Sequence, residues 1–560
     1  MGLPTFLFTL FFAAIIYVFF NNQRKKSKIP NGCIPLPGPT PLPIIGNLHQ
    51  INNVPIQDFI DRFSKEYGPI FQVHYGAETW VILNDYEIVK DVLVKRSAIY
   101  SSRPYNDATT RVYFDGGKSI GFSPYGKYWR AMRAVSHQAL TQKMVNINYR
   151  DIIHNEVKNL MIKFYVRSSE SFNPTNDLRF FLINLLTTIL FGQKSEKLTQ
   201  QIEQMVSEIA QILRPENCTI DKFPWLKYIP FVEKRINRHA YKARDLAREL
   251  FKHLLEDLRQ KLKENENENS FAAHVLKNMN ISSDIVSKPY EDSLENDDDE
   301  LKKQFVFDEV DFMNLNNSFL IAGAITSLNF FQWIWALLAN YPEAQRKIQK
   351  ELDECLQGNR FQTPQDDLKL PYLWATIKES LRCRTGSSTL MKHSTTKDDV
   401  YRGYYIPAKA TIMMSYKSAH TSEKLFERPN EFYPEHYLDE NGQLKKYDDL
   451  RDPWTFGRGR RACVGQHLAE RNLITTVGYA LTLFNVENDY DSITGNPIKL
   501  DLKLVDKKQP YKVRIEGSRG LIAEENSDGS RRTIMTTINS PPPPLTYPFR
   551  KRIPSPNASS

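Results

Sequence analysis

The chain has 560 residues, and the 41% that are hydrophobic provide enough apolar side chains for a sizeable core, which excludes a wholly disordered protein. Lys and Arg total 74 against 65 Asp and Glu, a modest formal charge of +9 that is spread along the chain. The charge therefore favours a membrane surface or a protein partner over a nucleic acid. The five cysteines are too few and too scattered for a disulfide framework, and no two have metal-ligand spacing.

The first segment of the chain has the composition of a membrane span. Residues 2–20 carry no charge, and about 20 apolar residues are enough to cross the hydrocarbon core. The basic stretch "NNQRKKSK" follows directly, which predicts that the rest of the chain lies on the cytoplasmic side. A cleaved signal peptide would carry its positive charge before the apolar run. We therefore expect a single transmembrane anchor at residues 1–20.

Composition divides the remainder into three parts. Residues 21–50 are basic and then rich in proline, as in a stiff spacer, although an ordinary proline-rich loop has the same composition. Residues 51–520 carry the patterned segments and form the expected catalytic domain. Residues 521–560 are rich in Ser and Pro, which predicts a disordered tail.

Within the large domain, short β-branched and aromatic runs around Gly76 predict a hairpin or small sheet. Residues 141–263 show apolar spacing of three and four, which is typical of helices, and residues 307–340 predict one long apolar helix with another after Pro342. Residues 287–304 are acidic and polar, so we expect an exposed connection there. The expected fold class is mainly α with small β-sheets.

The segment "FGRGRRACVG", residues 456–465, surrounds Cys463 with three glycines and three arginines. A lone cysteine is most often a small apolar core residue. Here the glycines allow the backbone to approach a flat ligand closely, and the arginines together with the following helical segment favour the thiolate. A thiolate without a second cysteine or histidine at ligand spacing suits an axial haem ligand better than a zinc cluster.

This segment resembles the F-x-x-G-x-R-x-C-x-G signature of the cytochrome P-450 family, through Phe456, Gly459, Arg461, Cys463 and Gly465. The resemblance implies the P-450 fold, a single large domain that binds haem b. It also implies that Cys463 is the axial iron ligand, that Phe456 and Gly465 contact the cofactor, and that Arg461 meets a haem propionate.

Two further matches concern the propionates. Trp129 and Arg133 in "WRAMR" are similar to the W-x-x-x-R motif of the family, although alone they would be an ordinary amphipathic turn. His393 stands where the family commonly has a basic residue at the other propionate, whereas a lone histidine is more often structural. The resemblance assigns all three residues to cofactor binding.

Glu379 and Arg382 lie three residues apart, where they can pair on one face of a helix. An isolated pair of this kind is usually a surface salt bridge. The resemblance identifies it as the E-x-x-R lock that holds the cysteine loop. His436 stands where the third member of the lock is normally arginine, and because histidine lacks the bidentate fork we expect a weaker lock.

The segment "FLIAGAITSLNF", residues 319–330, resembles the distal motif A-G-x-[D/E]-T-[T/S] of the family. Gly323, Thr326 and Ser327 match and are the expected catalytic residues, while Ile325 occupies the position of the acid. The resemblance implies proton delivery to dioxygen, which needs a hydroxyl and a carboxylate within hydrogen-bond reach. Alternatively, the Thr326 hydroxyl bonds back to its own helix.

These matches imply a monooxygenase that inserts one atom of O2 into a lipophilic substrate, with a pocket formed by residues 101–120, 319–326 and 389–392. No flavin or dinucleotide motif is evident, so we expect electrons from a separate NADPH-dependent reductase docked near Arg458 and Arg460, with a small cytochrome as a further partner. The expected location is the endoplasmic reticulum membrane, with the catalytic domain in the cytoplasm.

Two alternatives of different kinds remain at this point. The missing distal acid would suit a hydroperoxide isomerase or dehydratase of the same fold, which needs neither O2 nor reductase. A haem-binding protein without catalytic activity would keep the cysteine but consume no oxygen. A nucleic-acid patch made by the arginines is a remote third interpretation.

Overall fold

The structure is a computed structural model that describes residues 29–499, apart from residues 279–306 and short gaps elsewhere, together with three strands beyond residue 512. The expected anchor at residues 1–20 and the expected connection at residues 287–304 lie outside the described residues.

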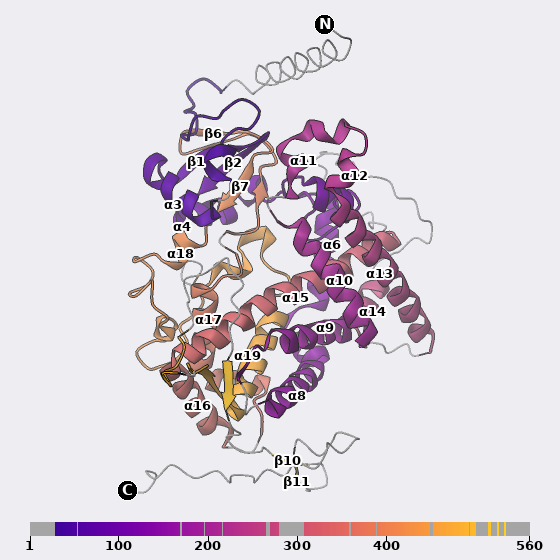
Figure 1. Cartoon of the computed structure of the whole chain (residues 1–560), viewed down its shortest axis with the longest axis vertical. Coiled ribbons are helices and arrows are strands. Elements are labelled where there is room, and N and C mark those ends of the chain that lie inside the picture. The colour runs from indigo at the N-terminus through magenta and orange to yellow at the C-terminus, as the bar shows by residue number, and fades with distance from the viewer. Residues whose placement is uncertain are drawn as a thin grey trace.

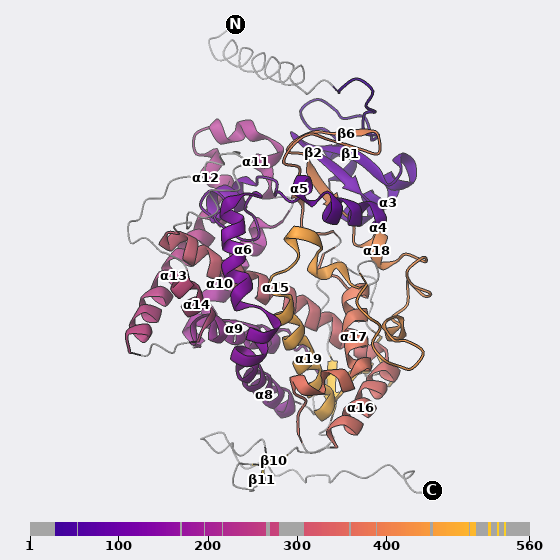
Figure 2. The same ribbon diagram turned by 180° about the vertical axis from the view of Figure 1, so that it is seen from behind.

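Helices form most of the described chain, and they pack side by side below a small sheet (Figures 1 and 2). Their bounds are α2 Leu48–Ile51, α3 Ile56–Tyr67, α4 Tyr86–Lys90, α5 Ser97–Tyr100, α6 Lys127–Ala139, α7 Gln142–Met144, α8 Arg150–Val166, α9 Thr175–Phe191, α10 Glu196–Ile212, α11 Thr219–Lys222, α12 Val232–Ile236, α13 Arg238–Glu264, α14 Phe271–Asn278, α15 Glu309–Asn340, α16 Pro342–Leu356, α17 Pro371–Cys383, α18 Lys417–His420 and α19 Gln466–Leu483.

The strands are short, so the prediction of a mainly α fold with small sheets is confirmed. A mixed sheet has the order β1-β2-β7-β4, and a second sheet has the order β3-β9-β8. The bounds are β1 Ile70–Tyr75, β2 Glu78–Leu83, β3 Ser171–Phe172, β4 His393–Ser394, β5 Asp399–Tyr401, β6 Tyr404–Ile406, β7 Thr411–Met414, β8 Asn485–Asn488, β9 Val513–Glu516, β10 Ala523–Glu525 and β11 Arg531–Thr533.

Two sequence predictions concern these strands. The expected hairpin around Gly76 is present, because β1 and β2 pair antiparallel on either side of it. In the tail, β10 and β11 also pair antiparallel, and residues 534–560 lie outside the described residues.

The long apolar helix is α15, and it lies in the middle of the molecule with α9 packed along it (Figure 1). It begins with a capping box in which Asp308 and Asp311 each accept from the other's backbone N–H. Of the described helices, α15 alone is long and apolar enough to span a membrane. Its buried residues belong to the main hydrophobic cluster, so we interpret it as a core helix.

Candidate functional site

A cavity of about 950 Å³ lies between α15, the loop before α19 and the mixed sheet. It includes residues from all three predicted pocket segments. Residues 101–120 contribute Arg103, Asn106 and Ile120, residues 319–326 contribute Phe319, Ala322, Gly323, Ile325 and Thr326, and all four residues of 389–392 contribute. It also brings together the residues assigned to cofactor binding and catalysis, namely Trp129, Arg133, Gly323, Thr326, Ser327, His393, Phe456, Arg461, Cys463 and Gly465.

Cys463 ends a tight loop whose sulfur faces this cavity. Its backbone N–H donates to the carbonyl of Phe456 at 2.7 Å, and α19 begins three residues later, as predicted. The residue is exposed, and because it lines the cavity this exposure is to the cavity interior, where the surrounding protein still encloses the thiol. Gly459 makes the loop possible, since it has a φ of +68° and an added Cβ would lie 1.9 Å from the carbonyl oxygen of Leu93.

The charge state of Cys463 depends on opposing influences. Burial raises the pKa of its thiol, while the backbone N–H of Gly465 and the charge of Arg133 favour the thiolate. The sequence pattern predicted this second role for the three neighbouring arginines, and the structure places it on Arg133 of α6 instead. Two of those arginines are hydrogen-bonded elsewhere: Arg460 donates to Ser97 Oγ at 3.2 Å, and Arg461 donates to the Ser101 carbonyl at 2.7 Å.

The cavity also holds positive charge that the described protein does not neutralise. Among the described residues, the guanidinium groups of Arg103, Arg133 and Arg461 form no ion pair with a carboxylate, although all three line the cavity. Burial and the charges of the other two arginines lower the pKa of Arg461. A group of buried like charges is costly unless an anion compensates it.

This arrangement fits a haem. Its two propionates would supply the missing negative charge, and the side of the loop toward the sulfur is open. An added Cβ at Gly465 would meet only Cys463 Sγ, at 3.9 Å. One thiol faces the cavity, and no group of three or more His, Cys, Asp or Glu side chains in the described residues could hold a metal ion, so the donor set is that of an axial haem ligand.

Trp129 and His393 take more specific positions than the sequence indicated. The indole N–H of Trp129 donates to the carbonyl of Ile120 at 3.0 Å, and its ring lies 4.1 Å from the Arg461 guanidinium, so its observed role is to stack. His393 Nδ1 donates to the Tyr100 carbonyl at 2.7 Å. Burial holds the pKa of His393 well below its usual value, so the ring is neutral. Its Nε2 takes no part in the hydrogen bond to Tyr100.

On the distal side, α15 presents Thr326 to the cavity. Its hydroxyl donates to the Ala322 carbonyl at 2.7 Å, which is the back-bonded arrangement that the sequence analysis kept as an alternative. Ile325 lines the cavity beside it, and no carboxylate of the described distal helix replaces the missing acid there. Gly323 serves close packing, because an added Cβ would lie 2.8 Å from Leu186 Cδ2 on α9.

The three lock residues do not line the cavity, and Arg382 and His436 both bond to Glu379. Arg382 donates to both carboxylate oxygens of Glu379, at 2.8 and 2.7 Å. His436 Nδ1 donates to Glu379 Oε2 at 3.3 Å, while its Nε2 accepts from the backbone N–H of Arg428. Burial alone would raise the pKa of Glu379, but these bonds lower it. His436 contributes one hydrogen bond of 3.3 Å to Glu379, where arginine could donate two parallel hydrogen bonds.

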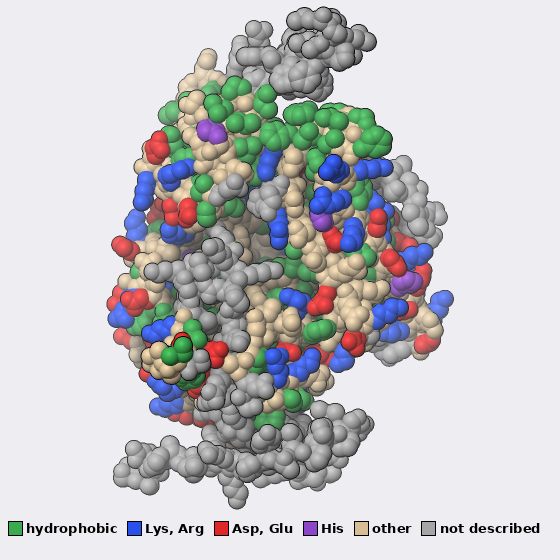
Figure 3. All heavy atoms as spheres, in the orientation of Figure 1, with side chains coloured by type: hydrophobic (Ala, Val, Ile, Leu, Met, Phe, Trp, Pro, Cys, Tyr) green, Lys and Arg blue, Asp and Glu red, His purple; other side chains and the backbone are tan. Residues whose placement is uncertain are grey.

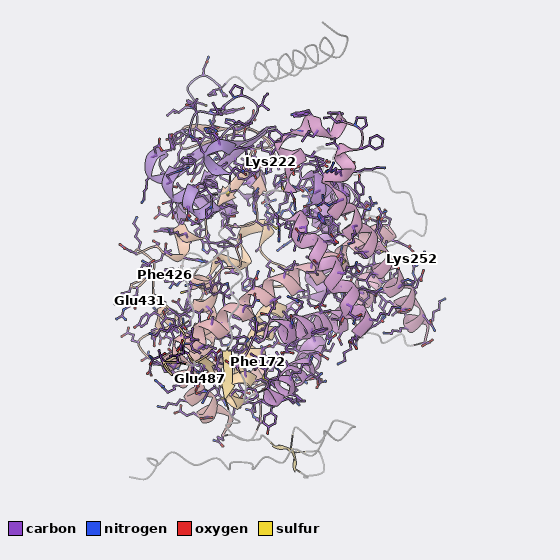
Figure 4. The ribbon with its side chains drawn as sticks, in the orientation of Figure 1. Phe172, Lys222, Lys252, Phe426, Glu431 and Glu487 are labelled. Carbon is purple, nitrogen blue, oxygen red and sulfur yellow. The ribbon has the colours of Figure 1, made fainter. Side chains whose placement is uncertain are left out.

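The lock also contacts the chain around it. Arg382 donates to the carbonyls of Pro429 and Glu431, at 2.7 and 2.8 Å, and its guanidinium lies 4.7 Å from the ring of Phe426. Figure 4 shows Phe426 and Glu431 close together on one side of the molecule, beside α17. The guanidinium therefore fixes the segment that carries His436 as well as its own helix.

Arg458 contradicts one sequence prediction. It was expected to face a reductase, but it is buried, with 8% of its surface exposed. Its guanidinium donates to the carbonyls of Asp452 and Pro453, at 2.8 and 3.3 Å, and so braces the cysteine loop from within. The spacing of charged residues in the sequence does not show which of them turn back to cap carbonyls of their own loop.

Two acidic residues on the cavity wall have no signal in the sequence. Glu78 from β2 and Asp221 from α11 line the cavity together with Arg103, which belongs to the predicted pocket segment at residues 101–120. They come from segments far apart in the chain, and none of them lies in a recognisable motif.

The fold, the cysteine loop and the cation-lined cavity define a haem-thiolate protein. A sequence profile of the family described as cytochrome P-450 matches residues 36–515, and the chain belongs to that family. It is similar to the cytochrome P-450 monooxygenase fogE of Aspergillus ruber, with 27% identity over 82% of this chain and 81% of that protein. It is also similar to the monooxygenase COX2 of Coprinopsis cinerea, with 29% identity over 87% of this chain and 88% of that protein.

A monooxygenase of Armillaria gallica is 28% identical over 89% of this chain and 90% of that protein. Together, the family and these relatives identify the chain as a haem-thiolate monooxygenase that uses haem b. Such an enzyme requires O2, a redox partner and a lipophilic substrate. The hydroperoxide isomerase and the non-catalytic haem protein are therefore the less favoured interpretations.

Proposed function

We propose that Cys463 is the axial ligand of the haem iron, and that Arg461, Arg133 and His393 bind the propionates. Because the Nδ1–H of His393 is donated to Tyr100, its part in this binding requires a proton on Nε2 as well, which the negative charge of a propionate would favour. The observation that carries this proposal is the cysteine sulfur facing a cavity in which Arg103, Arg133 and Arg461 form no ion pair with a carboxylate of the described residues. When bound, the haem supplies the activation of dioxygen. The protein holds the thiolate, orients the cofactor and delivers protons.

Thr326 and Ser327 are the proposed distal residues. For Thr326 to pass a proton, its hydroxyl must exchange its bond to the Ala322 carbonyl for one to a water molecule or to the reacting oxygen. Because Ile325 brings no carboxylate, protons would reach Thr326 through water and neighbouring amides and hydroxyls, of which Asn329 lines the same cavity. The expected consequence is slower proton delivery than with an acid at position 325.

The reductase in this proposal is a separate NADPH-dependent flavoprotein, and a small cytochrome is a second electron donor. Arg460 replaces Arg458 as the docking candidate, because Arg460 is exposed on the outer side of the cysteine loop and Arg458 is buried. Its charge would attract an acidic partner surface and raise the association rate. The domain boundaries given above remain part of the proposal.

We also assign the enzyme to the endoplasmic reticulum membrane, anchored by residues 1–20 with the catalytic domain in the cytoplasm. A surface of large apolar residues supports this assignment. Trp225, Tyr228 and Phe231, around α12, are 40%, 77% and 89% exposed, and Ile34 and Leu42 of the proline-rich segment are 55% and 47% exposed. Figure 3 shows hydrophobic side chains gathered at the end of the molecule where these segments lie. Such a patch is typical of a membrane-contacting surface.

The decisive experiment uses the full-length protein in phospholipid vesicles with an NADPH-dependent reductase. A thiolate-type reduced carbon-monoxide spectrum and product formation that requires NADPH and O2 are expected. Turnover of a lipid hydroperoxide without reductase, and none with it, would indicate an isomerase instead. The double variant Tyr228→Ser/Phe231→Ser should weaken association of an anchor-deleted chain with vesicles, while the exposed-site control Leu368→Ser should not.

A further inference from the structure

The cavity that Cys463 lines also extends to a group of charged side chains contributed by three separate segments. Glu78 and Trp80 come from β2, Asp221 from α11, and Lys392 from the residue that precedes β4. Figure 4 shows Lys222, the neighbour of Asp221, between the mixed sheet and α11. This group, here called the sheet-end cluster, lies in a cavity that is otherwise largely apolar.

The wall that carries the cluster is closely built. The carbonyl of Lys222 packs against the β1–β2 turn, where an added Cβ on Gly76 would lie 2.4 Å from it. Asp221 accepts from the Asp107 backbone N–H at 2.7 Å and from the Asn106 side chain at 2.5 Å. Both of its oxygens therefore have donors from the protein, and α11 is fixed to two neighbouring segments.

Lys392 is the member of the cluster whose donors are not used. Its Nζ lies 3.9 Å from the centroid of the Trp80 ring, and among the described residues it has no hydrogen-bond acceptor and no carboxylate in ion-pair contact. Its backbone is held in place, because Arg103 Nη1 donates to the Lys392 carbonyl at 2.7 Å. Burial lowers the pKa of Lys392, and the nearby charge of Glu78 opposes that change. A positioned ammonium therefore faces the cavity.

The surrounding charges decide which ligand group it would accept. Glu78 and Asp221 stand on the same wall, and burial already raises the pKa of both, that of Asp221 to about 7, so a further carboxylate beside them is disfavoured. Lys392 together with Lys222 would repel an ammonium. A neutral oxygen acceptor avoids both penalties and receives a charge-assisted hydrogen bond. The remaining lining is suited to a hydrocarbon body, since it includes Phe122, Leu182, Leu185, Leu186, Ile189 and Phe319.

We propose that Lys392 binds a neutral oxygen acceptor, a carbonyl or hydroxyl, at one end of a lipophilic substrate and thereby selects the carbon that lies on the distal side near Thr326. This inference rests on the proposed function, because it concerns the substrate of the same cavity. Lys392 is a specificity-determining residue in this proposal and takes no part in oxygen activation. The Trp80 ring holds the lysine ammonium in position, and Arg103 holds its backbone.

The test is a binding titration of the full-length haem protein. Binding is measured through the shift in the haem spectrum that accompanies displacement of the iron-bound water. The probes are dodecane, methyl dodecanoate and dodecanoate, which share a chain and differ in the end group. The wild-type protein should bind the ester at least about tenfold more tightly than dodecane, as expected for one charge-assisted hydrogen bond. It should also prefer the ester to dodecanoate.

Lys392→Met keeps the stem and removes the charge, so the ratio of ester to alkane affinity should fall to within about twofold while dodecane binding is unchanged. Lys392→Arg should restore part of the preference. Lys227→Met, at an exposed lysine outside the cavity, is the matched control and should behave as wild type. A ratio that is unchanged in Lys392→Met, or a preference for dodecanoate, would overturn the proposal.

These outcomes are separable from failure of the proposed function. A normal reduced carbon-monoxide spectrum in each variant establishes that haem is bound through the thiolate before any ligand is added. If that spectrum is absent in the wild-type protein, the proposed function fails. If it is present and the ester preference does not depend on Lys392, only this inference fails.

Discussion

His420 Nε2 accepts a hydrogen bond from the backbone N–H of Trp454 at 2.9 Å, which joins α18 to the start of the cysteine loop. The carbonyl of the same histidine accepts from the guanidinium of Arg382. A continuous path therefore runs from Glu379 through Arg382 and His420 to the segment that precedes Cys463. Thr455 adds a second link, because its hydroxyl donates to the Leu381 carbonyl on α17 at 3.1 Å.

This path predicts a pH dependence of stability. Burial and the charges of Arg382 and Arg458 lower the pKa of His420 from 6.5 to about 3. Above pH 6.5 the histidine is neutral in the folded and unfolded states alike. As the pH falls below 6.5, only the unfolded chain takes up the proton, so this histidine removes about 1.4 kcal/mol of stability per pH unit until its folded pKa is reached.

The measurement is the urea midpoint between about pH 7 and about pH 5, where the slope with pH should be smaller for His420→Gln than for wild type. His137→Gln, at an exposed histidine of α6, should keep the wild-type slope. His154 has its pKa lowered to about 4, chiefly by burial, so part of the acid sensitivity should persist in His420→Gln. Equal slopes in His420→Gln and wild type would refute the linkage.

The histidine of the lock can be tested with a matched pair of substitutions. His436→Leu removes the donor to Glu379 Oε2 and should lower the free energy of unfolding by about 1–3 kcal/mol, because a buried carboxylate loses a partner. His436→Asn places an amide donor near the position of Nδ1 and should cost less. Urea unfolding and the rate of haem loss report the difference. Equal rates of haem loss in the two variants would show that the hydrogen-bond donor to Glu379 does not determine haem retention.

Gly459 should tolerate no side chain. Gly459→Ala combines a φ of +68° with a Cβ that would lie 1.9 Å from the Leu93 carbonyl oxygen, so the loss of stability should exceed about 4 kcal/mol or prevent folding. Gly442→Ala is the control, because its φ is +72° but nothing lies within 4 Å of the added Cβ. It should cost about 1 kcal/mol, which isolates the contribution of the backbone angle.

The axial ligand has a direct spectroscopic test. Cys463→Ser should fold but give no thiolate-type reduced carbon-monoxide spectrum, because serine does not supply the thiolate. Cys33→Ser removes a cysteine outside the cavity and should keep the wild-type spectrum. A thiolate-type spectrum in Cys463→Ser would assign the iron to another residue.

The distal helix predicts opposite effects for two substitutions. Ile325→Asp places a carboxylate beside Thr326 and should raise the fraction of NADPH that ends in product by about two- to tenfold, since proton delivery is then assisted. Thr326→Ala should lower the same fraction and raise peroxide release, while Thr326→Ser retains the hydroxyl and should remain near wild type. Product and peroxide measured per NADPH distinguish these results.

Local patterns in the sequence were sufficient for several elements. The apolar run of α15, the turn at Gly76 and the position of Cys463 before α19 all follow from residues near one another in the chain. The grouping of Glu379 with Arg382 was equally predictable, because a helix places residues three apart on one face.

Only the tertiary structure decided where the charges point. Arg458 and Arg461 look equivalent in the sequence and both line the cavity, yet Arg458 donates to the carbonyls of Asp452 and Pro453 in its own loop while Arg461 donates to the Ser101 carbonyl of a distant segment. The sheet-end cluster joins Glu78, Asp221 and Lys392, whose separation along the chain gives no local signal. A long side chain takes the acceptor that folding brings within its reach, and that choice depends on contacts between distant segments.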